Sequence, residues 1–291
     1  MTRGMKVMRD LPLIVWFIAA IIIAIVHRWV PEATWLMVHL VALGALTHSV
    51  MVWSAHFSAA LLKTRSDEAT TRRANIRLAM LGLGALIVFI GVPTAIWWLT
   101  LVGTVAVGAA VVWHGAQLFS DLRKALPGRF RICIRYYVAS ASLLPVGIGF
   151  GAALAWGLGD DWNARLLIAH TMTNLLGWIG LTLVGTLVTF WPTLLRTRMD
   201  DRSEKLARQT LPILLLAIAA VDVGALVGIR WISVLGLGIY LFGLLSMDSG
   251  AGRPFVGVLR RPWSCGAQRC RGRPGRRPAA ARPQAVAPQR P

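Results

Sequence analysis

Five of the six histidines lie within long apolar stretches: His39, His48 and His56 in one, and His114 and His170 in two others. Imidazoles are rare inside membrane-spanning helices, where they face the bundle interior, a cavity or a ligand. Neutral imidazole is the commonest metal ligand in proteins, and histidines from two helices can also hold a haem iron. The chemistry that these residues indicate is therefore metal or haem ligation.

Depth in a membrane groups four of these histidines into two pairs. Counted at a rise of about 1.5 Å per residue, His39 and His170 lie at nearly the same level, close to the outer ends of their stretches. His56 and His114 share a level near the inner ends. We predict that these four residues bind a cofactor, haem b or copper or both. His48, near mid-membrane, is a further candidate metal ligand beside His39 and His170.

Angular position limits how these side chains can cooperate. At about 100° per residue, His39 and His56 differ by about 100° around a straight helix, and His48 lies nearly opposite His39. One straight helix therefore cannot direct all three into one cavity. The alternative is that these imidazoles only form hydrogen bonds between helices, and His48 in particular could bond a neighbouring helix.

Composition indicates a polytopic membrane protein. Hydrophobic residues make up 56% of the 291 residues and charged residues 15%, whereas a soluble domain has about 25% charged residues. The stretch Thr34–Leu62 has no Asp, Glu, Lys or Arg, and about 20 apolar residues suffice to cross the hydrocarbon. The sequence predicts an all-α transmembrane helix bundle of about eight spans. These are Leu11–Val30, Thr34–Leu62, Leu78–Val92, Trp97–Phe119, Tyr136–Trp156, Leu166–Leu195, Thr210–Gly228 and Trp231–Met247.

Charge in the connecting segments predicts the orientation. Alternate loops and the N-terminal segment hold 18 Lys and Arg, and the opposite loops hold three. By the positive-inside rule the first set is cytoplasmic, so both termini are predicted to be cytoplasmic in a multi-pass protein of the plasma membrane. The basic loops thus have a topological role, and we expect no nucleic acid partner. The sequence has no Gly-rich phosphate loop, G-x-S-x-G or H-E-x-x-H motif, and whether the protein is an enzyme stays open.

The C-terminal segment differs from the rest of the chain. Residues 1–250 form the predicted transmembrane domain, and residues 251–291 a basic Arg/Pro-rich tail with ten Arg and no acidic residue. Such a composition cannot bury a core, so the tail is expected to be disordered. Its arginines could attract anionic lipid. Alternatively, the tail is the product of a frameshift or truncation.

Other polar groups lie inside the predicted spans. Asp222 is the only acidic residue well inside one, where it could pair with Arg165 or Arg230, carry protons, or stay neutral. Thr171, Thr173 and Asn174 lie close to His170 and could bond its second ring nitrogen.

One segment resembles a known family. The run from His170 to Thr182, HTMTNLLGWIGLT, resembles the H-x-H-x-N-L-L-G-W-x-G-L-T segment of haem–copper-type membrane proteins, which include oxidase subunit I-like and NnrS-like groups. The run from His39 to Phe57 is similar to a helix in membrane domains that some actinobacterial proteins fuse to a cupredoxin (multicopper oxidase-like) domain, and Thr186–Met199 also fits that group. The resemblance implies that His39 and His170 are haem or copper ligands. Met172 departs from the pattern, because it replaces the second histidine of the motif.

The sequence thus predicts an integral membrane protein with a histidine-ligated haem or copper redox module, which transfers electrons as part of an oxidase-like protein. Its expected partners are the lipid bilayer and a cupredoxin domain or another redox protein. The alternative is a non-redox membrane transporter or anchoring module whose histidines bridge helices.

Overall fold

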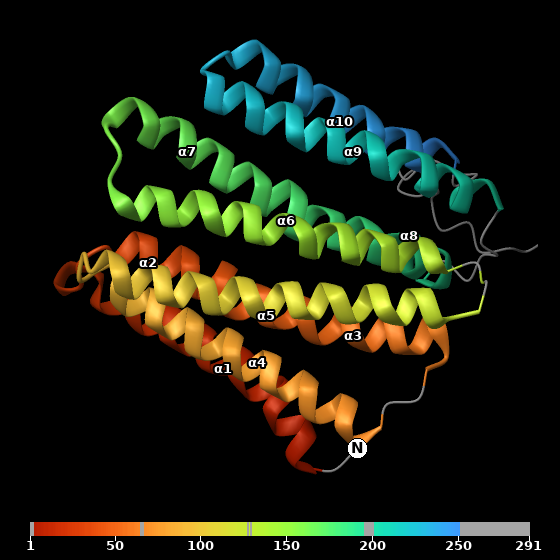
Figure 1. Cartoon of the computed structure of the whole chain (residues 1–291), viewed down its shortest axis with the longest axis horizontal. Helices are drawn as coiled ribbons and strands as arrows, with labels where there is room; N and C mark the ends of the chain where they lie inside the picture. The colour runs from red at the N-terminus through yellow and green to blue at the C-terminus, as the bar shows by residue number, and fades with distance from the viewer. Residues whose placement is uncertain (1–2, 65–66, 127, 129, 195–200, 251–291) are drawn as a thin grey trace, which may run out of the picture. The chain divides into compact units, whose positions relative to one another are not determined.

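The computed structural model describes residues 3–64, 67–126, 128, 130–194 and 201–250, and every regular element in these ranges is a helix (Figure 1). Eight helical segments are long and apolar enough to cross a membrane, which confirms the predicted all-α class and the eight spans. The basic tail, residues 251–291, lies outside the described residues.

Two of the eight spans are interrupted by π-helix, and the others are continuous α-helices apart from a short 3-10 turn. The elements are α1 (Arg3–Val26), the 3-10 turn η1 (His27–Trp29), α2 (Ala33–His39), the π-helix η2 (Leu40–Leu46), α3 (Thr47–Leu62), α4 (Glu68–Gly91), α5 (Trp97–Lys124), α6 (Arg131–Trp156), α7 (Asp160–Met172), the π-helix η3 (Thr173–Gly180), α8 (Leu181–Leu194), α9 (Asp201–Val227) and α10 (Arg230–Gly250).

Several helices extend beyond the predicted spans at their basic ends. The third span was predicted to begin at Leu78, but α4 begins at Glu68, where the carboxylate of Asp67 accepts a hydrogen bond from the backbone N–H of Thr70 (2.8 Å). Likewise, α5 continues to Lys124. Hydropathy marks only the part of a helix that lies in hydrocarbon, so it does not detect the turns that continue into water.

Neighbouring spans pack as successive hairpins. Helix α4 packs on α5, α5 packs on α6, and α9 packs on α10. Helix α6 also contacts α7, η3 and α8, so it lies between the spans before it and those after it (Figure 1). One apolar cluster joins five elements through Met51, Leu81, Val107, Leu144 and Trp178, and it therefore fixes α3, α4, α5, α6 and η3 against one another.

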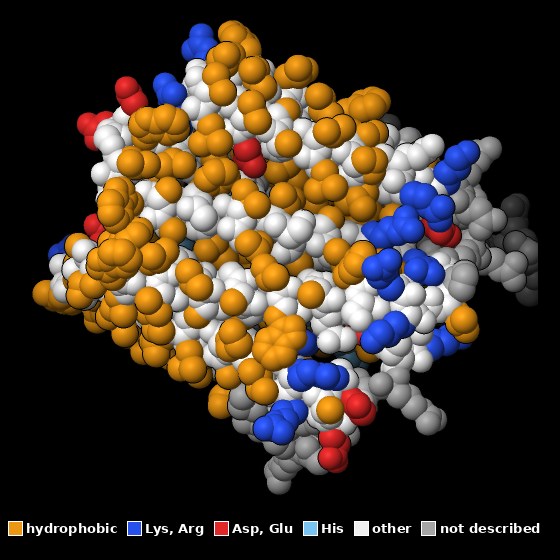
Figure 2. Space-filling model, viewed as in Figure 1, with side chains coloured by type: hydrophobic (Ala, Val, Ile, Leu, Met, Phe, Trp, Pro, Cys, Tyr) orange, Lys and Arg blue, Asp and Glu red, His pale blue; other side chains and the backbone are white. Residues whose placement is uncertain are grey.

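Side chains on the surface follow the predicted topology. Figure 2 shows apolar side chains along the flanks of the helices and most Lys and Arg side chains at one end, where α3 and α5 end and α4 and α6 begin in Figure 1. Five exposed tryptophans lie at the opposite helix ends, as expected of an interfacial aromatic belt, whereas the exposed Trp53 lies within α3. The five are Trp29, Trp98, Trp156, Trp162 and Trp231.

Candidate functional site

The imidazole rings of His39 and His170 lie side by side. Their centroids are 6.0 Å apart and their planes differ by 28°. His39 is the last residue of α2 in the second span, and His170 lies near the end of α7 in the sixth span. Both side chains are half-buried. The structure thus brings together two histidines that the sequence placed at one depth on different helices.

The Nδ1 atom of each ring bonds to a backbone carbonyl. His39 Nδ1 donates to Trp35 O and His170 Nδ1 donates to Gly147 O, each at 2.8 Å. A carbonyl only accepts hydrogen bonds, so Nδ1 carries the proton in both rings. In a neutral imidazole the lone pair then lies on Nε2, which is the state that binds a metal. Such a bond through the other nitrogen is also what orients a metal-binding histidine.

A π-helix follows each of the two histidines. Leu40–Leu46 begins directly after His39, and Thr173–Gly180 begins three residues after His170. π-Helical turns are rare and are frequent at functional sites. In the first, the hydroxyl of Thr47 donates to Ala42 O (2.9 Å). Because the i→i+5 turn is wound more loosely than an α-helix, the angular positions that the sequence predicted for a straight helix do not apply beyond His39.

Two glycines of α6 make room for the side chains of the sixth span. A Cβ atom at Gly151 would lie 2.8 Å from Cε1 and 3.0 Å from Nδ1 of His170. A Cβ atom at Gly147 would overlap the side-chain amide of Asn174. From the sequence alone these glycines indicate only close helix packing. Their i, i+4 spacing is the signal that both face the same neighbour.

An aromatic side chain missed by the sequence analysis completes the surroundings of His39. The indole of Trp35 stacks on the imidazole, with ring centroids 4.0 Å apart and planes 18° apart. Trp35 also meets Phe89 of α4 edge to face, at 6.4 Å between centroids. By its residue type and its place near a helix end, Trp35 looks like an interfacial anchor. In the sequence, only its i, i+4 spacing from His39 indicates that the two rings meet.

The polar residues after His170 have separate partners. The side-chain nitrogen of Asn174 lies 3.4 Å from Nδ1 and 3.5 Å from Nε2 of His170, and its oxygen is buried and has no partner among the described residues. Thr173 instead donates to Oδ2 of Asp222 on α9, at 2.8 Å. Asn174 thus lies against the ring of His170, as expected, and Thr173 bonds a different span.

The arginines suggested as partners of Asp222 bind elsewhere. Arg165 Nη1 donates to Leu226 O (3.2 Å), and its Nη2 lies 3.0 Å from the Cβ position of Gly228. Gly228 has φ +80° in the tight turn between α9 and α10, a conformation that glycine adopts without strain. The Arg230 guanidinium lies over the ring of its neighbour Trp231. Asp222 is thus held by Thr173 and not by an arginine.

The structure does not bring His56 and His114 together. His114 is buried, and its Nε2 lies 2.9 Å from Oγ of Ser54. His56 is exposed and contacts the rings of Trp53 and Phe57. In the described part of the chain, no hydrogen bond or ring contact joins the two histidines. A common depth in the membrane, as predicted for these two residues, does not determine the direction in which each side chain points.

His48 joins two spans. Its Nε2 donates to Arg9 O of α1 at 2.9 Å, and the side chain is buried. This is the helix-bridging arrangement that the sequence left open as the alternative to a metal ligand.

The separation of the His39 and His170 rings can be compared with that of two imidazoles that share one metal ion. An ion bound to both Nε2 atoms at about 2.0–2.1 Å would hold the ring centroids at most roughly 6 Å apart. The observed separation of 6.0 Å lies at this limit. Residues 3–250, where described, bring together no group of three or more His, Cys, Asp or Glu side chains that could hold a metal. A metal ion or haem held here would thus have two imidazoles as its side-chain ligands among the described residues.

No protein-family model, curated protein or solved structure matches this chain. The resemblance to haem–copper and NnrS-like membrane proteins is therefore supported only in its coarsest part, a polytopic helical membrane protein. The assignment of a function depends on the geometry of the site itself.

Proposed function

We propose that this integral, multi-pass membrane protein is an electron-transfer module that binds haem b or copper through His39 and His170. The observation that carries the proposal is that the two imidazole rings lie close together and have the same hydrogen-bonding pattern. Each comes from a different span, each donates Nδ1–H to a carbonyl, and their centroids lie 6.0 Å apart. Two imidazoles held in this way can direct their Nε2 lone pairs towards one ion, which would take the place of the Asn174 side-chain nitrogen that lies 3.5 Å from His170 Nε2.

The surroundings of the pair support this role. When bound, a haem or copper ion would supply one-electron oxidation and reduction. The residues of this chain would fix the ligands: Trp35 stacks on one face of His39, and Gly147 and Gly151 leave space for His170 and Asn174. A π-helix after each histidine is consistent with a functional site.

The position of the pair indicates the redox partner. His39 and His170 lie near the ends of their spans that are predicted to face away from the cytoplasm. An electron donor or acceptor would therefore dock on the outer face. A cupredoxin domain or another small redox protein fits this position, and the plasma membrane is the proposed location.

The test is an absorption spectrum, with metal analysis, of the detergent-solubilised protein after expression with added haem or copper. We expect a Soret band, or about one copper ion per chain, that is lost in His39→Ala and in His170→Ala. His27→Ala is the matched control, because His27 is exposed and bonds within its own helix to Ala24 O (3.0 Å). A colourless, metal-free wild-type protein would contradict the proposal and favour a non-redox transporter or anchoring module.

A further inference from the structure

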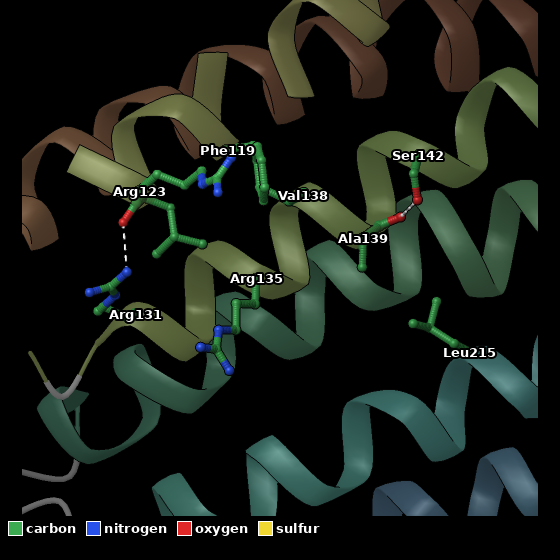
Figure 3. A pocket seen from close by; sticks show the side chains of 9 residues that line it. Phe119, Arg123, Arg131, Arg135, Val138, Ala139, Ser142 and Leu215 are labelled. Carbon is green, nitrogen blue, oxygen red and sulfur yellow. Dashed lines mark hydrogen bonds between the residues drawn. The ribbon is translucent and has the colours of Figure 1, made fainter. Parts of the chain in front are cut away.

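A groove of about 590 Å³ opens at the basic end of the helices, between α5, α6 and α9 (Figure 3). None of the site histidines lines it. Of the nine described residues that do, three are arginines, none is acidic, and most of the others are apolar. The groove thus combines positive charge with an apolar wall at the predicted cytoplasmic surface.

The three arginines lie at one end of the groove, as Figure 3 shows. Arg123 and Arg135 are exposed, and Arg135 forms no hydrogen bond or ion pair with any described residue. Arg131 is held in place by two carbonyls, because Nη2 donates to Leu122 O (2.8 Å) and Nη1 to Ala125 O (3.3 Å), and its Nε is buried and has no partner in the described part of the chain. Guanidinium groups arranged in this way suit a phosphate, which accepts several charge-assisted hydrogen bonds.

The apolar part of the groove continues along the same stripe of α6. Arg131, Arg135, Val138 and Ser142 are spaced i, i+4, i+7 and i+11, so they share one face of the helix and extend over about 16 Å. Ser142 adds no free donor, because its hydroxyl already donates to the carbonyl of Ala139 (2.7 Å). The lining changes from cationic to apolar in the direction from the cytoplasmic surface towards the hydrocarbon.

We propose that this groove binds an anionic phospholipid, with its phosphate at Arg123, Arg131 and Arg135 and an acyl chain along Val138, Ser142 and Leu215. Basic pockets between spanning helices on the cytoplasmic side are sites for acidic headgroups. An acidic peptide would satisfy the arginines but would leave the apolar part of the groove without a matching group. A phospholipid supplies both parts in the order in which the groove presents them.

The headgroup arm of the test compares phosphatidylglycerol and phosphatidylcholine with identical chains, each titrated into the full-length protein in detergent and counted by native mass spectrometry. Arg123→Gln/Arg135→Gln should weaken phosphatidylglycerol binding about 30-fold, or about fivefold per arginine. The control Arg72→Gln/Arg73→Gln removes the same charge from exposed residues of α4. It should change binding less than about twofold, because neither residue lines the groove.

The acyl-chain arm uses Ser142→Phe, which fills the apolar end without removing charge. This variant should weaken binding of phosphatidylglycerol but leave binding of soluble glycerol phosphate unchanged. Thermal melting and size-exclusion profiles identify any variant that misfolds. If a variant misfolds, the preference of the wild-type protein for phosphatidylglycerol over phosphatidylcholine still tests the proposal. The proposal would be overturned if phosphatidylcholine bound as tightly as phosphatidylglycerol, or if the α4 control lost as much binding as the groove variant. It would also be overturned if glycerol phosphate or an acidic peptide bound as tightly as the lipid.

Discussion

Trp178 and Thr47 form a hydrogen bond that links the two π-helical segments. The indole Nε1 of Trp178, within η3, donates to the hydroxyl of Thr47, the first residue after η2, at 3.3 Å. The same hydroxyl donates back to Ala42 O within η2. A continuous path of chain and hydrogen bonds therefore runs from His39 through η2, Thr47, Trp178 and η3 to His170.

Trp178→Phe tests this link. The substitution keeps an aromatic ring in the apolar cluster but removes the donor, so we expect a loss of about 1 kcal/mol in stability, the typical value for a hydrogen bond between membrane helices. Thermal unfolding in detergent measures it. Trp156→Phe is the control, because Trp156 is exposed at the outer end of α6. An equal effect of the two substitutions would show that the Trp178–Thr47 bond contributes nothing.

Gly151→Ala tests the space for His170. The added methyl would lie 2.8 Å from the imidazole Cε1, so the ring must move and its bond to Gly147 O must weaken. Loss of such an orienting bond lowers metal affinity about 10–100-fold. Gly149→Ala on the same helix is a close control, since nothing lies within 4 Å of its Cβ position. Haem or copper titration compares the two variants, and unchanged affinity in Gly151→Ala would argue against His170 as a ligand.

His114 and His56 should differ in their effect on stability. His114→Ala removes a buried side chain that contacts Ser54, and we expect a loss of about 2–3 kcal/mol, as for other large-to-small changes in a core. His56→Ala, at an exposed position, should change stability by less than about 0.5 kcal/mol. Neither substitution should change the spectrum of a cofactor held by His39 and His170. A spectrum lost in a folded His114→Ala protein would restore His114 as a ligand.

The cap of α4 should respond to pH. Hydrogen bonds from the side chain and the backbone N–H of Thr70 to the carboxylate lower the pKa of Asp67 below its ordinary value. A lowered folded-state pKa stabilises the fold above the unfolded pKa, and this contribution is lost as pH falls through the folded pKa. Melting temperatures at pH 6 and below should therefore show a smaller acid-induced decrease in Asp67→Asn, which keeps a capping side chain but cannot ionise. An identical pH profile in both proteins would contradict this role.

The spans and the depth of the histidines could be predicted, but the π-helices could not. Uncharged length is visible in a sequence, and equal numbers of residues from two helix ends place His39 and His170 at one level. A π-helix depends on which carbonyl each N–H selects, and the composition of Leu40–Leu46 does not differ from that of an ordinary apolar helix. The assumption of a straight helix therefore failed directly after His39.

Contacts between distant parts of the chain also could not be predicted from the sequence. The bond from His48 to Arg9 O and the pairing of His114 with Ser54 depend on how the spans rotate against one another. Hydrophobic pattern constrains this rotation weakly in a membrane, where lipid and core are equally apolar. The glycines of α6 gave a partial signal, because Gly147 and Gly151 are spaced by one turn.

His39 lies in the second span and His170 in the sixth, and this separation along the chain has a consequence for biosynthesis. Spans enter the membrane in chain order, and at about 5–20 residues per second the two histidines leave the ribosome on the order of 10 s apart. During that interval the second span has no counterpart for its imidazole. A ligand that requires both rings could bind only after the sixth span has inserted and packed against α6, so loading of the proposed site would be a late event in the assembly of this protein.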